Sequence, residues 1–273
     1  MEFLSPRQLF TQEVTQPELQ IDVAKAALYI AQEEYPNLRP GDYLCLLDQM
    51  ATVIKARLPT ERYPLRILKI INQYLYEDFG FTGNLENYYD PCNSFLNDVL
   101  DRRTGIPITL ALVYLEIAKR IDFPMVGIGM PGHFLIRPDF EGSEIFVDAF
   151  HQGDILFPQE CESRLGQIYG RKVALHPHFV SPVRPRRFLI RLLNNLKVIY
   201  MNQQQFYKAL GAVDRILLVM PGLPSELRDR GLLQFQLGQW QAALVDLQQY
   251  LALVPQAEDA EAIGQLVIEL RRQ

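Results

Sequence analysis

The segment TGIPITLALVYLEIAKRIDFP, residues 104–124, constrains the fold more than any other part of the chain. Pro107 stands where the first turn of a helix accepts a proline. The residues after it are apolar on almost every side of a helix: Ile108, Leu110, Ala111, Leu112, Val113, Leu115, Ile117, Ala118 and Ile121. A helix that is apolar nearly all round has to be buried. We therefore predict that this segment forms the central helix of a domain.

The segments on both sides of this helix predict what covers it. Residues 17–103 carry apolar side chains at helical spacing in the stretches 17–34, 42–58 and 63–80, so this region is predicted to be helical. After Pro124 the pattern changes to three short runs rich in β-branched and aromatic residues, MVGIGM, HFLIR and EIFVDAF, which predict strands. The first part of the chain is therefore predicted to have an α+β fold.

The last part of the chain contains an internal repeat. FYKALGAVDRILLVMPGLP and WQAALVDLQQYLALVPQAE align at an offset of 34 residues, with Phe206 on Trp240, Ala209 on Ala243, Leu210 on Leu244 and Pro221 on Pro255. This period is typical of tetratricopeptide repeats, which are pairs of helices. The proline-rich stretch HPHFVSPVRPRR before them is interpreted as a linker. We predict domains at 1–180 and 185–273, the second an all-α module of two repeats and a terminal helix.

Composition narrows the classes of function. A chain with 48% apolar and 22% charged residues is typical of a globular protein, and a net charge of −5 disfavours nucleic acid or an anionic membrane as partner. No segment has the roughly 18 consecutive apolar residues of a membrane span, and MEFLSPRQLFTQE shows no secretory signal. The odd set of widely spaced cysteines, Cys45, Cys92 and Cys161, favours the cytoplasm. No glycine loop that would cradle a phosphate is present, so no cofactor is predicted.

The predicted strands 133–137 and 144–150 bring one histidine and one aspartate together. A hairpin turn centred on Phe140 and Glu141 pairs His133 with Asp148 across the two strands. Directly opposed residues have Cβ atoms about 5 Å apart, so Asp148 is within reach of a ring nitrogen of His133. The pair has two of the three members of a catalytic triad. The alternative is an ion pair that only satisfies two half-buried polar groups.

Three stretches resemble a known family: NSFLNDVLDRRTGIPITLALVYLEIAKR, MPGHFLIR and VDAF. They are similar to the SirB-type family, a branch of the transglutaminase-like superfamily whose members also carry C-terminal tetratricopeptide repeats. The resemblance runs from about residue 85 to the end of the chain. It implies an α+β core of the papain-like cysteine protease type, in which a Cys opens the central helix, a His lies on the next strand and an Asp on the strand after it. The His maps onto His133 and the Asp onto Asp148.

The motif Cys has no counterpart, because its place falls in the window Pro107-Ile108-Thr109. A thiol at a helix start beside a histidine is activated by the helix dipole and the imidazolium, whereas a threonine hydroxyl is far less acidic. Thr109 is therefore interpreted as a capping or packing residue. Cys92, at the start of a predicted helix in YYDPCNSFL, is the remaining candidate nucleophile.

Other residues near the pair are interpreted as binding residues. Asn93 belongs to the family-like segment, and Tyr88 and Tyr89 either line a groove beside His133 or simply pack. His151 would complete a metal-ligand set with His133 and Asp148. Because no second motif supports zinc, the sequence predicts no metal site.

Two hypotheses on function follow. In the first, the protein is non-catalytic, or at least not cysteine-catalytic, and binds a protein or peptide through the groove of the former active site and through the repeats. In the second, it is a hydrolase or acyl transferase that uses His133 as general base, Asp148 to orient it, and Cys92, Thr109 or water as nucleophile. The sequence gives no indication of the oligomeric state.

Overall fold

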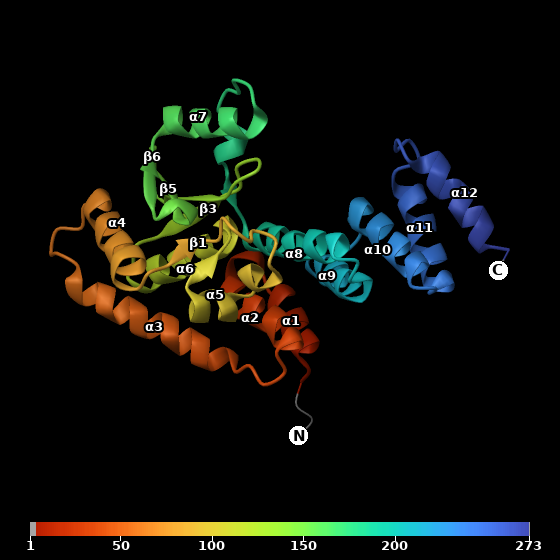
Figure 1. Ribbon diagram of the computed structural model, residues 1–273, viewed down its shortest axis with the longest axis horizontal. Helices are drawn as coiled ribbons and strands as arrows, with labels where there is room; N and C mark the ends of the chain where they lie inside the picture. The colour runs from red at the N-terminus through yellow and green to blue at the C-terminus, as the bar shows by residue number, and fades with distance from the viewer. Residues whose placement is uncertain (1–3, 273) are drawn as a thin grey trace. The chain divides into compact units, whose positions relative to one another are not determined.

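The structure is a computed structural model that describes residues 4–272 (Figure 1). It divides into two compact units, Met1–Phe188 and Leu189–Gln273. The domain boundaries at residues 180 and 185 remain a prediction from the sequence. The first unit combines helices with a five-stranded sheet, and the second is helical, so the α+β fold followed by an all-α module is confirmed.

Helices form most of the first unit before the sheet. They are α1 (Pro6–Val14), α2 (Val23–Glu34), α3 (Pro40–Arg57), α4 (Pro64–Asn72), α5 (Leu96–Arg102) and α6 (Pro107–Arg120). The helix predicted from Pro17 begins only at Val23, because the Asp22 side chain accepts the backbone N–H of Lys25 at 2.9 Å and so caps the helix there. The short 3₁₀ turn Glu18–Gln20 precedes it.

The apolar helix α6 is the centre of this unit. Pro107 occupies its first turn, and its described residues from Pro107 to Tyr114 are all buried. It packs against α3 and α5 and against strands β3 (Met125–Ile128) and β4 (Leu135–Pro138). The prediction of a covered central helix is confirmed, since helices cover one side of α6 and the sheet covers another.

The main sheet has the strand order β6-β5-β4-β3-β7 and is antiparallel throughout. The three predicted strands correspond to β3, β4 and β5 (Phe146–Asp148), and β6 (Asp154–Leu156) follows. The stretch interpreted as a linker contributes β7 (Pro182–Val183), so that interpretation is wrong there. Pro182 is tolerated because β7 is an edge strand, and the backbone N–H groups along the outer edge of such a strand need no partner strand. A separate parallel pair joins β1 (Thr82–Gly83) and β2 (Thr104–Gly105).

The predicted register between β4 and β5 is wrong by two residues. The structure pairs Ile136 with Val147, and the turn bond runs from the Ser143 N–H to the Phe140 carbonyl at 3.2 Å. Gly142 takes the left-handed position of this turn, with φ +74°. A position with φ > 0 favours glycine, so the turn is centred one residue later than predicted. A shift of two residues keeps each side chain on its face, and His133 and Asp148 therefore stay on one side of the sheet.

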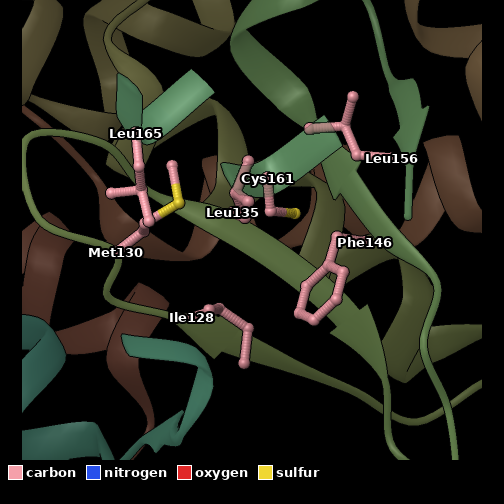
Figure 2. Close-up of a cluster of buried hydrophobic side chains, with 7 residues drawn as sticks. All are labelled: Ile128, Met130, Leu135, Phe146, Leu156, Cys161 and Leu165. Carbon is pink, nitrogen blue, oxygen red and sulfur yellow. The ribbon is translucent and has the colours of Figure 1, made fainter. Parts of the chain in front are cut away.

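Helix α7 (Pro158–Tyr169) covers one face of the sheet. Figure 2 shows the buried cluster between them, made by the strand residues Ile128, Leu135, Phe146 and Leu156, by Met130 just after β3, and by the helix residues Cys161 and Leu165. Because strand side chains alternate, Asp148 lies on the same face as Phe146, the face that α7 covers.

The second unit consists of repeated helices. Helix α8 (Pro185–Asn202) begins in the first unit, and α9 (Phe206–Val219), α10 (Pro224–Gln236), α11 (Trp240–Leu253) and α12 (Ala260–Leu270) follow. The repeated segments form α9 and α11, where Ala209 and Ala243 are completely buried. Gly231 on α10 lies directly against α11, since an added Cβ would be 2.7 Å from Leu247. The small residues of the repeat thus mark close helix contacts.

Candidate functional site

Asp148 is the centre of the candidate site. It ends β5, is completely buried, and caps the 3₁₀ turn Ala149–His151. Its Oδ1 accepts the backbone N–H groups of Phe150 at 3.1 Å and His151 at 3.3 Å. These two bonds fix the plane of the carboxylate and direct Oδ2 toward the neighbouring side chains.

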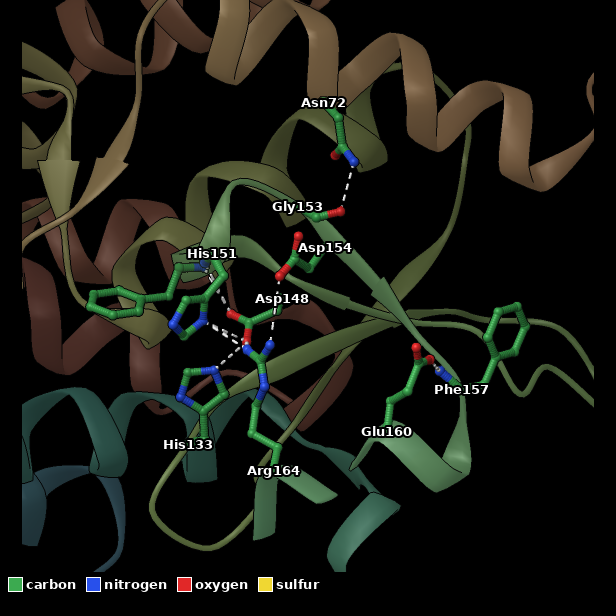
Figure 3. A network of polar contacts seen from close by, with 10 residues as sticks. Asn72, His133, Asp148, His151, Gly153, Asp154, Phe157, Glu160 and Arg164 are labelled. Carbon is green, nitrogen blue, oxygen red and sulfur yellow. Dashed lines mark hydrogen bonds and ion pairs between the residues drawn. The ribbon is translucent and has the colours of Figure 1, made fainter. Parts of the chain in front are cut away.

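Three side chains converge on Asp148 Oδ2 (Figure 3). His133 Nε2 lies 2.8 Å from it, His151 Nδ1 lies 2.9 Å from it, and Nη1 of Arg164 is in direct contact with it. The same Arg164 nitrogen is 2.7 Å from His151 Nδ1. The structure therefore brings the predicted pair His133–Asp148 together and adds two further members.

Arg164 is a member of the site that sequence reasoning missed. Asp148 and Asp154 are register partners on β5 and β6, and like charges directly opposite each other are unfavourable. Arg164 lies between them, with Nη2 3.6 Å from Asp154 Oδ2. Burial lowers the pKa of its guanidinium. One signal could have found it: Cys161 and Leu165 of α7 face the sheet at helical spacing, which places Arg164 at the margin of that face.

Aromatic rings line one side of His133. Phe150 is 6.3 Å from the His133 ring, and Tyr88 is 6.2 Å from Phe150, both edge to face. Tyr89 contacts Tyr88 at 5.3 Å and is itself 60% exposed. Of the two predicted tyrosines, Tyr88 thus reaches the site through Phe150, while Tyr89 points largely to solvent.

The Thr109 hydroxyl is hydrogen-bonded to backbone groups at the start of α6. It is buried, donates to the carbonyl of Asn93 at 2.7 Å, and accepts the N–H of Ile106 at 3.1 Å. These bonds tie the start of α6 to the preceding loop. A hydroxyl that donates its proton to a backbone carbonyl is not presented to a general base, and Thr109 therefore has a structural role at the helix start.

Asn93 is likewise committed to the backbone. It is completely buried, and its amide nitrogen donates to the carbonyls of Asn87 at 2.8 Å and Tyr88 at 3.2 Å. Its amide oxygen accepts from Asn84 at 3.0 Å. Asn93 therefore holds the loop that carries the two tyrosines, and it offers no side-chain atom to a ligand.

Cys92 lies in an acidic environment. Its sulfur is 3.9 Å from the hydroxyl of Tyr35, which itself donates to Asp98 at 2.6 Å. Burial, together with the nearby carboxylates of Asp90 and Asp98, raises the pKa of the Cys92 thiol. Cys161 is buried on the side of α7 that faces the sheet, and burial raises its pKa to about 12. These environments disfavour the thiolate that a cysteine nucleophile requires.

Two family profiles match this chain. The profile of the transglutaminase-like superfamily matches residues 41–194, and that of the tetratricopeptide repeat matches residues 196–267. A UPF0162 protein of Xylella fastidiosa is 34% identical over 255 residues, which cover 92% of this chain and 90% of that protein. The chain belongs to the UPF0162 family. This is the SirB-type family of the sequence resemblance, which is thereby confirmed.

Two further relatives match a smaller share of the chain. A UPF0162 protein of Vibrio cholerae is 31% identical over 189 residues, covering 69% of this chain and 70% of that protein. Human F-box only protein 21 is 33% identical over 186 residues, which cover 64% of this UPF0162 chain and 29% of that protein. No solved structure matches. Within residues 4–272, no helix has the length and apolar character needed to cross a membrane.

Proposed function

We propose that this UPF0162 protein binds a protein or peptide segment in a groove of its repeat unit and carries out no cysteine chemistry. The observation that supports this most is a groove of about 510 Å³ along α8 and α10, within the size range of ligand sites. Apolar side chains that a fold leaves exposed in a hollow are typical of a site that a partner covers.

The walls of the groove indicate the chemistry of the partner. Val198 and Met201 of α8 and Leu232 of α10 line it and are 45%, 43% and 37% exposed. At its edge Lys197 is already paired with Glu226 at 2.8 Å and with Asp229 at 2.9 Å. Asp229 is also paired with Arg228 at 2.9 Å. Because these two cations and two carboxylates balance one another, the groove favours a peptide that inserts an apolar side chain over one that offers a charge.

The binding test uses a defined probe. A peptide selected from a randomised library on the full chain is labelled, and its affinity is measured by fluorescence anisotropy. Met201→Glu and Leu232→Glu are expected to weaken binding by about tenfold or more, since each puts a charge into an apolar anchor site. Val245→Glu and Ile268→Glu are matched controls, because these residues are 56% and 52% exposed but do not line the groove.

Equal affinity of the groove variants and the wild type would contradict the proposed site. Binding that is lost in the control variants as well would point to a general effect of added charge on the unit. Circular dichroism of each variant separates either result from unfolding.

A hydrolase or acyl transferase remains the second candidate, favoured by the 2.8 Å contact between His133 and Asp148. The raised pKa of Cys92 and the bonded hydroxyl of Thr109 leave water as its nucleophile. The test is mass spectrometry of the bound peptide after incubation with the protein, with and without a primary amine. We expect no cleavage and no amine incorporation. A product made by the wild type and absent with His133→Ala would establish the enzyme instead.

We further propose that the protein acts in the cytoplasm. The support is the chemistry of its cysteines, since Cys45, Cys92 and Cys161 are all free thiols, which suits a reducing compartment. Fractionation of cells that produce the chain tests the proposal, and recovery with the periplasmic or secreted fraction would contradict it.

A further inference from the structure

We propose that His133, Asp148 and His151 form a binding site for a divalent transition-metal ion of the zinc class, and that the Arg164 guanidinium holds the position of that ion in the present conformation. The proposal concerns the first unit alone and does not depend on peptide binding by the repeats.

The donor atoms converge at the right scale. His133 Nε2, Asp148 Oδ2 and His151 Nδ1 all lie within 4.8 Å of one another, with 2.8 Å and 2.9 Å between each imidazole nitrogen and the carboxylate oxygen. Ligands bound tetrahedrally to zinc at about 2.0–2.2 Å are about 3.4 Å apart. The two imidazole–carboxylate separations are therefore about half an ångström shorter than this spacing, so each imidazole moves away from Asp148 by about that amount when the ion binds.

The surroundings of the three ligands suit a metal ion with one coordination position left open. The carboxylate is already oriented, because Oδ1 accepts the N–H groups of Phe150 and His151. The His151 side chain is 42% exposed, whereas those of His133 and Asp148 are 9% and 0% exposed. Two imidazoles and one carboxylate form a ligand set found in zinc sites whose fourth position binds water or a ligand oxygen. The ion therefore enters from the side of His151, the most exposed of the three ligands.

The Arg164 guanidinium already places a positive charge between two of the proposed ligands, Asp148 and His151. Its Nη1 contacts Asp148 Oδ2 and lies 2.7 Å from His151 Nδ1. A guanidinium can only donate hydrogen bonds, so it takes the lone pairs that a metal would take. A cation therefore already fits between these two ligands.

The carboxylates of the site carry enough negative charge to attract a cation in addition to Arg164. Asp148 and Asp154 share the single guanidinium of Arg164, and two carboxylates outweigh one positive charge. Asp154 is 57% exposed and 3.6 Å from Nη2 of Arg164, so it can keep the arginine when an ion displaces Nη1. Metal and arginine are thus expected to compete for Asp148, with Asp154 as the alternative partner of the arginine.

Zinc binding to the full chain tests the proposal. The protein is stripped with a chelator, and Zn²⁺ affinity is measured by competition with a chromophoric chelator. We expect one ion per wild-type chain. His151→Ala is expected to weaken binding more than the roughly 10–100-fold that loss of an outer partner causes. Arg164→Ala is expected to tighten binding by about tenfold or more, because it removes the competing cation.

The other histidines provide the matched control. The chain has four, and the remaining two, His176 and His178, lie close together outside the cluster. A variant carrying both His176→Ala and His178→Ala should keep the wild-type affinity. Because His151 is half-exposed, His151→Ala should stay folded, which circular dichroism checks. The Co²⁺ complex gives a second readout, since its visible absorption should disappear in His151→Ala.

Two results would overturn the proposal. One is zinc affinity that survives in His151→Ala and disappears in the His176/His178 variant, since the ion would then be bound at those residues. The other is the absence of binding to both the wild type and Arg164→Ala, since Arg164→Ala removes the competing guanidinium.

Discussion

Replacing Thr109 by valine removes one oxygen from the buried start of α6 and keeps the branched shape of the side chain. In the structure this oxygen donates to the Asn93 carbonyl at 2.7 Å and accepts the Ile106 N–H at 3.1 Å. The exposed fractions of Thr109, Ile106 and Asn93 are 1%, 1% and 0%. No solvent is therefore available to replace the lost partner.

The cost follows from the two backbone groups that are left unpaired. A buried donor or acceptor without a partner costs about 1–3 kcal/mol. The Ile106 carbonyl is unaffected, because it also accepts the N–H groups of Thr109 and Leu110. We therefore expect Thr109→Val to lower the free energy of unfolding of the first unit by about 2–6 kcal/mol. At about 3 °C per kcal/mol for a unit of this size, Tm falls by about 6–18 °C.

Differential scanning calorimetry and urea unfolding followed by far-UV circular dichroism measure this change. Thr109→Ser is the control, because it keeps the hydroxyl and loses only a methyl group, at about 1 kcal/mol. The reasoning is refuted if Thr109→Val is as stable as Thr109→Ser or the wild type. In that case the hydroxyl would be dispensable for the fold, and a chemical role for it would have to be considered again.

Two further predictions follow from the same structure. Burial and nearby carboxylates raise the pKa of the Cys92 thiol, so at about pH 7 iodoacetamide should alkylate Cys92 more slowly than the exposed Cys45, and the rate at Cys92 should increase as the pH rises. Peptide mass spectrometry measures both rates, and equal rates would count against the environment assigned to Cys92. Gly231→Ala should destabilise the repeats by about 1–3 kcal/mol, because the new Cβ would lie 2.7 Å from Leu247. Helix propensity alone predicts that the same substitution raises the free energy of unfolding by about 1 kcal/mol. Urea unfolding followed by the fluorescence of Trp240 decides between the two, because the unfolding midpoint falls if the contact with Leu247 dominates and rises if helix propensity does.

The fold was predictable where one local pattern determined the structure. The apolar segment after Pro107 had to become a covered helix, and the 34-residue offset fixed helices α9 and α11. The register of β4 and β5 was not predictable from strand alternation alone, because alternation fixes the face of each residue but not its partner. The position of Gly142 contained that information, since the turn needed a residue with positive φ.

The site was predictable only in part. The His133–Asp148 pair follows from strands that are adjacent in sequence, and it survives the register error because the shift is even. Arg164 comes from a helix packed on the sheet. Helical spacing puts it at the margin of the sheet-facing side of α7, but its contact with Asp148 depends on how α7 is placed on the sheet. The bond between Thr109 and the Asn93 carbonyl likewise joins two segments whose contact arises only on packing.

Hydrogen–deuterium exchange of the full chain, with and without the selected peptide, tests the central claim most directly. Binding in the repeat groove predicts slower exchange of amides in residues 197–206 of α8 and α9 and 229–236 of α10 when the peptide is present. The loops beside Asp148, at residues 84–91, 130–133 and 149–153, should exchange as in the free protein. Protection confined to those loops, with α8 and α10 unchanged, would contradict the account and place the ligand at the His133–Asp148 site.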